Sequence, residues 1–163
     1  MRQAREGSGA HPAPRRACCW GLLVLALGTG CDEGQAPLCT GNDCTCTAGA
    51  TCAPRCEESG DCAIECRERS TCGADCGSTT GQCGVQCGAG SSCSTACVRS
   101  AVCDVQCSGA TDCSVDCGTA ATCRVVCPET ACVVHHCELG RNCTVTCGAA
   151  GAARPSGTDA LCE

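Results

Sequence analysis

The sequence predicts an all-β, disulfide-rich fold, a β-solenoid of about ten units with ten residues each. Two observations carry this prediction. The chain has 27 cysteines in 163 residues, and the twenty between positions 52 and 147 recur in pairs with a period close to ten. The residue midway between the paired cysteines is most often valine. A fixed period of this kind is typical of stacked repeat units.

The cysteine pairs define the unit. Nine of the ten pairs have the spacing C-x3-C, and the period slips by one residue at three places, two of which cancel. All twenty cysteines are expected to form disulfides, because their number far exceeds the level that marks a disulfide scaffold. The pairs are Cys52 and Cys56, Cys62 and Cys66, Cys72 and Cys76, Cys83 and Cys87, Cys93 and Cys97, Cys103 and Cys107, Cys113 and Cys117, Cys123 and Cys127, Cys132 and Cys137, and Cys143 and Cys147.

Each unit predicts one short strand and one tight turn. In the pattern C-x-V-x-C the cysteines and the valine alternate with small or polar residues, which places them on one face of a strand. The five remaining positions are rich in Gly, Ser, Thr and Ala, which are common in turns. A helix is disfavoured because a period of ten does not match the helical period over ten repeats.

Two arrangements of such strands remain open: a β-solenoid, which we favour, and an antiparallel meander. A solenoid coil can hold ten residues, or twenty with two units facing each other, and alternate units show no systematic difference. Ten stacked ten-residue coils would form a rod of roughly 45–50 Å. Two cysteines at i and i+4 of an extended strand lie about 13 Å apart, so the partner lies in another unit or the segment bends. The spacing alone does not fix the pairing.

The composition makes covalent cross-links necessary. The chain has no Phe or Tyr, and beyond Cys31 the apolar residues larger than valine are only Leu38, Ile64, Leu139 and Leu161. Burial of such small side chains, at roughly 25 cal/mol per Å², does not offset about 1–2 kcal/mol of backbone entropy per ordered residue. Disulfides are the available compensation.

Residues 1–30 are predicted to be a signal peptide. A polar segment with four arginines precedes an apolar run of eleven residues at 17–27, too short to span a bilayer. The following Gly28, Thr29, Gly30 and Cys31 resemble the lipobox of bacterial lipoproteins, although the leucine lies four rather than three places before the cysteine. The resemblance implies a lipid on Cys31. The alternatives are cleavage after Gly28 with secretion, and an uncleaved N-terminal anchor.

This interpretation divides the chain into a signal peptide (1–30), a lipid-anchored linker with cysteines (31–51), the repeat (52–147) and a small, polar tail (148–163), expected to be mobile as far as Cys162. We expect Cys162 to pair with a cysteine outside the repeat or to cap the last coil. Lipidation of Cys31 would leave 24 cysteines, an even number that can pair completely. The chain is then expected in the bacterial cell envelope, on the periplasmic or extracellular side, with secretion as the alternative. The membrane is the expected partner, through the lipid.

The charge and the motifs exclude several functions. Beyond residue 30 the net charge is −9, from seven arginines and sixteen acidic residues, which disfavours nucleic acid as a partner. C-x-C occurs once and C-x2-C nowhere, so a thiol-rich metal-binding protein is only an alternative. His135 and His136 are weak candidates for metal ligands. Asp104, Asp112 and Asp116 are treated as solvated acids, and we expect no enzyme activity and no cofactor.

The ten-residue, cysteine-rich period resembles the disulfide-bridged antifreeze solenoids of insects. The resemblance covers about residues 52–147 and implies ice binding as an alternative function. However, the row before the first cysteines mixes Thr, Asp, Gln, Val and Asn, whereas an ice-binding face needs one rank of like residues. Our first hypothesis is therefore an exported, non-enzymatic surface lipoprotein, a rigid rod that serves as a structural, adhesion or binding module.

Overall fold

A computed structural model describes residues 38–40, 42–56, 60–77, 81–129, 131–149 and 151–163. The predicted signal peptide (1–30) and the predicted lipidation site Cys31 lie outside these residues. The described part of the chain consists of strands and turns, which confirms the prediction of an all-β fold. Among the described residues, no helix is long and apolar enough to cross a membrane.

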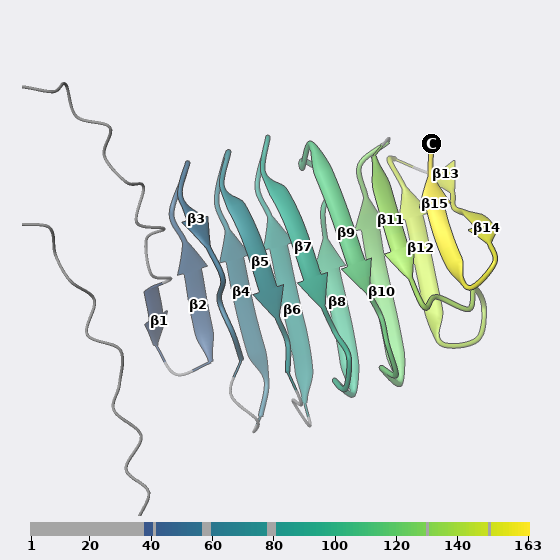
Figure 1. Ribbon diagram of the computed structural model, residues 1–163, viewed down its shortest axis with the longest axis horizontal. Coiled ribbons are helices and arrows are strands. Elements are labelled where there is room, and N and C mark those ends of the chain that lie inside the picture. Colours follow the sequence, from purple (N-terminus) through teal and green to yellow (C-terminus); the bar gives the residue numbers. More distant parts are fainter. Residues whose placement is uncertain (1–37, 41, 57–59, 78–80, 130, 150) are drawn as a thin grey trace, which may run out of the picture. The chain divides into compact units, whose positions relative to one another are not determined.

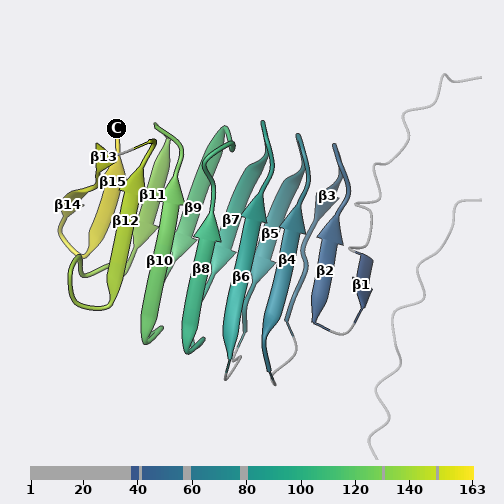
Figure 2. The same ribbon diagram turned by 180° about the vertical axis from the view of Figure 1, so that it is seen from behind.

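The described strands form a β-solenoid with two facing sheets (Figures 1 and 2). The first sheet has the order β1 (Leu38–Thr40), β2 (Asp43–Cys46), β4 (Cys62–Cys66), β6 (Gln82–Cys87), β8 (Val102–Gln106), β10 (Thr122–Cys127), β12 (Cys143–Cys147) and β13 (Gly151–Ala152). The second has the order β14 (Arg154–Ser156), β15 (Asp159–Cys162), β11 (Cys132–His135), β9 (Asp112–Asp116), β7 (Ser92–Ala96), β5 (Thr71–Asp75) and β3 (Thr51–Cys52). The repeat strands within each sheet run parallel, so the solenoid is confirmed and the antiparallel meander is wrong.

One coil holds two units, about twenty residues. Cys103 pairs in register with Cys123 on the first sheet, and Cys93 with Cys113 on the second. Each unit crosses one sheet and turns, and the next unit returns across the other sheet, so sequential strands lie on opposite sheets. The first sheet has eight strands, and seven spacings of about 4.8 Å give roughly 34 Å. The solenoid is therefore shorter than the rod expected for ten-residue coils.

The central positions of alternate units differ only in the first part of the repeat. On the first sheet the central residues in the repeat are all isoleucine or valine: Ile64, Val85, Val105, Val125 and Val145. On the second sheet, the first three units carry Pro54, Ala74 and Thr95, and the last two carry Val115 and Val134. The alternation in the first three coils has a period of twenty, and it is a partial signal for the coil length.

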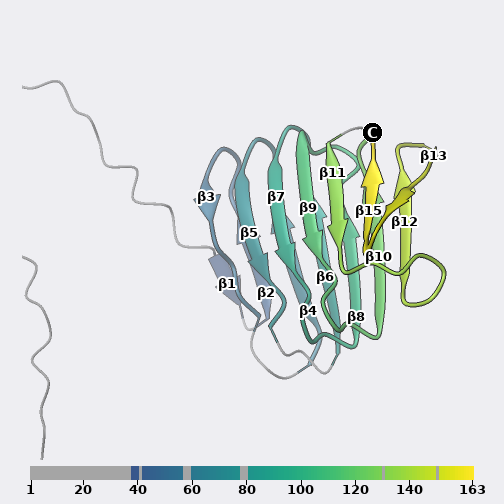
Figure 3. The ribbon, with the colours of Figure 1, turned by 45° about the vertical axis from the view of Figure 1, so that its right-hand side comes forward.

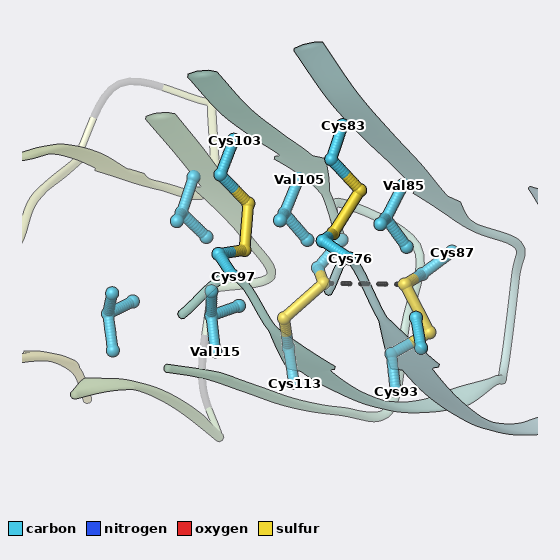
Figure 4. Close-up of a cluster of buried hydrophobic side chains, with 14 of the residues drawn as sticks. Cys76, Cys83, Val85, Cys87, Cys93, Cys97, Cys103, Val105, Cys113 and Val115 are labelled. Carbon is cyan, nitrogen blue, oxygen red and sulfur yellow. Dashed lines mark hydrogen bonds between the residues drawn. A yellow bond between two sulfur atoms is a disulfide. The ribbon is translucent and has the colours of Figure 1, made fainter. Parts of the chain in front are cut away.

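The core lies between the sheets and consists of cysteine and valine. Within the strands, buried and exposed residues alternate, as in the pattern BeBeB of β4, with each cysteine and each central residue turned inward. Figure 4 shows Val85, Val105 and Val115 packed among the disulfides of neighbouring coils. The predicted inward face of C-x-V-x-C is thus confirmed.

Turns that lead from the first sheet to the second also stack. Gly49, Arg69 and Gly90 occupy equivalent places with positive φ, and the amide of each donates a hydrogen bond to a carbonyl of the next turn. Glycine adopts this conformation without steric cost, whereas Arg69 adopts it at φ 57°. Beside these positions, the buried hydroxyls of Ser70 and Ser91 each donate a hydrogen bond of 2.7 Å to a carbonyl of their own turn.

Among the described residues, antiparallel strands cover both ends of the first sheet and the C-terminal end of the second. β1 pairs with β2 at one end, while β13 pairs with β12 and β15 with β11 at the other (Figure 3). The expected mobile tail is therefore wrong for the described residues of 148–163, which form three strands. The repeat geometry also begins ten residues earlier than expected, because Cys44 and Cys46 of β2 stand in register with Ile64 and Cys66.

Candidate functional site

Eleven disulfides are described, and they follow one rule: the second cysteine of each unit bonds to the first cysteine of the next. Their Cα atoms lie 5.3–6.4 Å apart, within the normal range. Each bond therefore closes a turn between the two sheets. The two cysteines of one C-x3-C pair bond to different units, which the length of an extended strand requires.

The disulfides form two ladders, one along each edge of the coils. The six-rung ladder closes the turns from the first sheet to the second and contains Cys46–Cys52, Cys66–Cys72, Cys87–Cys93, Cys107–Cys113, Cys127–Cys132 and Cys147–Cys162. The five-rung ladder closes the opposite turns and contains Cys56–Cys62, Cys76–Cys83, Cys97–Cys103, Cys117–Cys123 and Cys137–Cys143. Cys162 thus bonds to the last repeat cysteine, not to one outside the repeat, and caps the last coil.

Adjacent rungs contact each other through sulfur. The Sγ atoms of Cys87 and Cys107 lie 3.6 Å apart, those of Cys56 and Cys83 3.9 Å, and those of Cys117 and Cys143 4.0 Å. Five groups of three Sγ atoms lie within 4.8 Å of one another, and each group joins two adjacent rungs. All of these sulfurs belong to disulfides. A soft metal ion binds thiolates, so in the oxidised chain these groups lack the charge that a metal cluster needs.

His135 and His136 lie where β11 ends, on the outer side of the second sheet. The Nδ1 atom of His135 lies 3.0 Å from a carboxylate oxygen of Asp159 in β15. The Nδ1 atom of His136 lies 2.8 Å from a carboxylate oxygen of Asp116 in β9. Each imidazole is thus held by a carboxylate from a different neighbouring strand.

These contacts shift two titrations. The hydrogen bond and the charge of Asp116 raise the pKa of His136 above its ordinary value. The hydrogen bond from His135 lowers the pKa of Asp159. In the described part of the chain, the groups of three ligand atoms that lie close enough together for a metal ion are all cysteines. The structure therefore does not bring the two histidines together with a carboxylate as a compact ligand set.

The three aspartates considered in the sequence do not form a cluster. Asp104 lies on the outer face of the first sheet, in register with Arg124. Asp112 and Asp116 lie at opposite ends of β9 in the second sheet, and Asp116 accepts a hydrogen bond of 2.9 Å from the amide of Gly118. The three side chains therefore have different neighbours.

The row that precedes the first cysteines separates into two rows once the coil holds twenty residues. On the second sheet it contains Thr51, Thr71 and Ser92 in register, followed by Asp112. On the first sheet it contains Gln82, Val102 and Thr122. The second sheet therefore presents hydroxyl groups on three successive coils. This row is not apparent when consecutive units of the sequence are compared, because consecutive units lie on different sheets.

A shallow hollow of about 310 Å³ lies on the outer face of the first sheet. Ala63 and Gly84 leave space there because one has only a methyl group and the other has no side chain, and Asp43, Glu65 and Gln86 also line the hollow. The hollow offers carboxylate and amide groups on a rigid, open surface.

The fold and its cross-links define a class of protein: an all-β solenoid with twenty-residue coils, in which disulfides between consecutive cysteines close the turns. No family model, no curated protein and no solved structure matches the chain. The arguments for function therefore rest on the geometry described above.

Proposed function

We propose that the protein is an exported, non-enzymatic lipoprotein of the bacterial cell envelope, anchored through a lipid on Cys31. Its solenoid serves as a rigid structural, adhesion or binding module on the periplasmic or extracellular side. The membrane is its partner through the lipid, and the acidic charge argues against nucleic acid. Anchoring by Cys31 rests on the lipobox-like sequence alone.

The observation that carries this proposal is the disulfide at each turn between consecutive repeat strands from β2 to β12. Disulfides persist in oxidising compartments outside the cytoplasm. In the chain-entropy treatment, a bond that closes a loop of about seven residues stabilises the fold by roughly 2 kcal/mol. Cross-links at this density support a module that keeps its shape without a core of large side chains.

A thiol assay under denaturing, non-reducing conditions tests the oxidised scaffold. After native purification we expect almost no free thiols in residues 46–162. A thiol-rich metal-binding protein would instead release many free thiols together with metal. Full reduction of the native, folded chain would contradict the proposal.

Metabolic labelling with a radioactive fatty acid tests the anchor. We expect label on the full chain and its loss in Cys31→Ala, with Cys162→Ala as the matched control that retains label. Label that survives Cys31→Ala, or an unlabelled wild type, would remove the anchor from the proposal.

Ice binding is the second candidate, and the hydroxyl row of Thr51, Thr71 and Ser92 favours it. The row lies on parallel strands with regular spacing, the arrangement that an ice-binding face needs. Asp112 interrupts it on the next coil. Crystal shaping in a nanolitre osmometer tests this candidate, and round crystals at millimolar protein would exclude it.

A further inference from the structure

The last rung of the six-rung ladder is more accessible than the others. From Cys44 onward, where the structure describes the cysteine side chains, Cys147 is partly exposed and every other cysteine is buried. Its partner Cys162 is 4% exposed and lies at the end of β15. Attack by a thiolate requires access to one sulfur of a disulfide, so Cys147 is the point where an external thiol reaches the ladder.

The sulfur that would leave in such an attack is already close to the next rung. The Sγ atoms of Cys162, Cys127 and Cys132 lie within 4.8 Å of one another. Cys127 and Cys132 form the adjacent disulfide, and Cys132 stands in register with Cys162 across the pairing of β11 and β15. A thiolate on Cys162 therefore faces an intact disulfide in the dry interior.

We propose that the Cys147–Cys162 disulfide of the C-terminal cap is an exchange site for dithiol reductants. We further propose that, after it is reduced, Cys162 exchanges with the neighbouring Cys127–Cys132 disulfide. A thiolate of the reductant attacks Cys147 Sγ, forms a mixed disulfide and releases Cys162 as the thiolate. Cys162 then attacks Cys132, which forms a Cys132–Cys162 bond and releases the Cys127 thiolate. The second thiol of the reductant resolves the mixed disulfide, leaves as a cyclic or intramolecular disulfide, and frees Cys147. Two electrons enter the chain, and one disulfide is lost overall.

The geometry confines the exchange to one ladder. The two ladders lie at opposite ends of the C-x3-C strands, which span about 13 Å when extended. This separation exceeds any distance at which sulfurs exchange directly. A thiol generated at the cap therefore stays on the six-rung ladder.

The substitution Cys147→Ser tests the transfer step directly, because it leaves Cys162 with a free thiol beside the intact rung. After rapid alkylation and peptide mass spectrometry of the full chain, we expect roughly a third or more of the label to leave Cys162 for Cys127 and Cys132. The matched variant Cys162→Ser frees Cys147, which belongs to none of the close three-sulfur groups, and its label is expected to remain on Cys147. Label that stays wholly on Cys162 in the first variant would overturn the proposal.

Limited reduction of the unmodified chain covers the case in which Cys147→Ser does not fold. With less than one equivalent of dithiothreitol, we expect the first label on Cys147 together with Cys127, Cys132 or Cys162, and none on the five-rung ladder. Removal of the cap disulfide by the double substitution Cys147→Ser and Cys162→Ser should slow reduction of the remaining rungs at least tenfold. The double substitution Cys107→Ser and Cys113→Ser, which removes an interior rung, should not. Equal rates in the two variants, or early label spread over both ladders, would refute an entry point at the cap.

Discussion

Thr95 is the polar exception among the central residues of the solenoid. It lies on β7 between Ala74 and Val115, its side chain is 3% exposed, and its Oγ1 atom has no hydrogen-bond partner in the structure. A buried hydroxyl without a partner costs free energy, because it has lost its bonds to water. The site otherwise suits a β-branched side chain of this size.

The substitution Thr95→Val is therefore expected to stabilise the fold. Valine has nearly the same shape and no hydroxyl, so the free energy of unfolding should rise by about 1–2 kcal/mol. Guanidinium denaturation under non-reducing conditions measures the change. Thr144→Val, at an exposed position of β12, is the control and should change stability by less than about 0.5 kcal/mol. A loss of stability in Thr95→Val would mean that the hydroxyl is satisfied.

The His136 and Asp116 contact predicts a pH dependence with a definite sign. Because the pKa of His136 is raised above 6.5, its contact with Asp116 stabilises the fold fully below pH 6.5 and is lost as the pH rises through the raised pKa. Because the pKa of Asp159 is lowered below 3.8, its contribution is present above pH 3.8 and is lost as the pH falls through the lowered pKa. Both contributions to stability are therefore fully present between pH 3.8 and pH 6.5.

NMR titration of the His136 ring protons tests this contact. We expect the wild-type midpoint to lie above 6.5, and Asp116→Asn to bring it back toward that value. Asp104→Asn, on the other sheet, is the matched control and should leave the midpoint unchanged. If Asp116→Asn leaves the His136 midpoint unchanged, the contact does not form in solution.

At the scale of the elements, the repeat strands were predictable and the caps were not. The alternation of Cys, Val and Cys indicates a strand without reference to other units. β15 carries no such signal, because it has one cysteine, Cys162, and Ala160 instead of valine at the position paired with Val134. The sequence did not predict β2 as a repeat strand, because Asn42 replaces the first cysteine of its unit and Cys44 occupies the central position. The positions of His135 and Asp116 on adjacent strands follow from the twenty-residue register, which the sequence interpretation left open.

The C-terminal strands are expected to keep the solenoid monomeric. Removal of residues 151–163, combined with Cys147→Ser to avoid a free thiol, exposes the edges of β11 and β12. Unpaired edges of parallel sheets bind other chains, so size-exclusion chromatography should show dimers or larger species. Arg154→Ala, which removes only the exposed ion pair with Glu163, should elute as the wild type does. If the truncated chain stays monomeric, another element prevents association through the sheet edges.

For the whole molecule, the coil of two units predicts which deletions the fold tolerates. Removal of residues 103–122 deletes one complete coil and joins Val102 to Cys123, which preserves the sheet on which each later strand lies. Removal of residues 103–112 deletes half a coil and moves every later strand to the opposite sheet, so the cap meets the wrong edges. We expect the first variant to form all its remaining disulfides and the second to retain free thiols.

Intact-mass measurement after alkylation, with thermal unfolding as a second reading, separates the two deletions. Deletion of residues 83–102, another complete coil, is a further control that should resemble the first variant. Equal tolerance of the half-coil deletion would mean that the two sheets are interchangeable, despite the different central residues Val85 and Thr95 on facing strands.

The order of the disulfides along the chain bears on how such a protein matures. From Cys46 onward every described bond joins a cysteine to the next one in sequence, with separations of five to seven residues except for fifteen at the last bond. A chain that crosses a membrane from its N-terminus can therefore be oxidised pair by pair as each cysteine emerges, and the nearest available partner is always the native one. Such a chain needs an oxidant but little shuffling by an isomerase, and only Cys147 has to wait for the final residues to arrive.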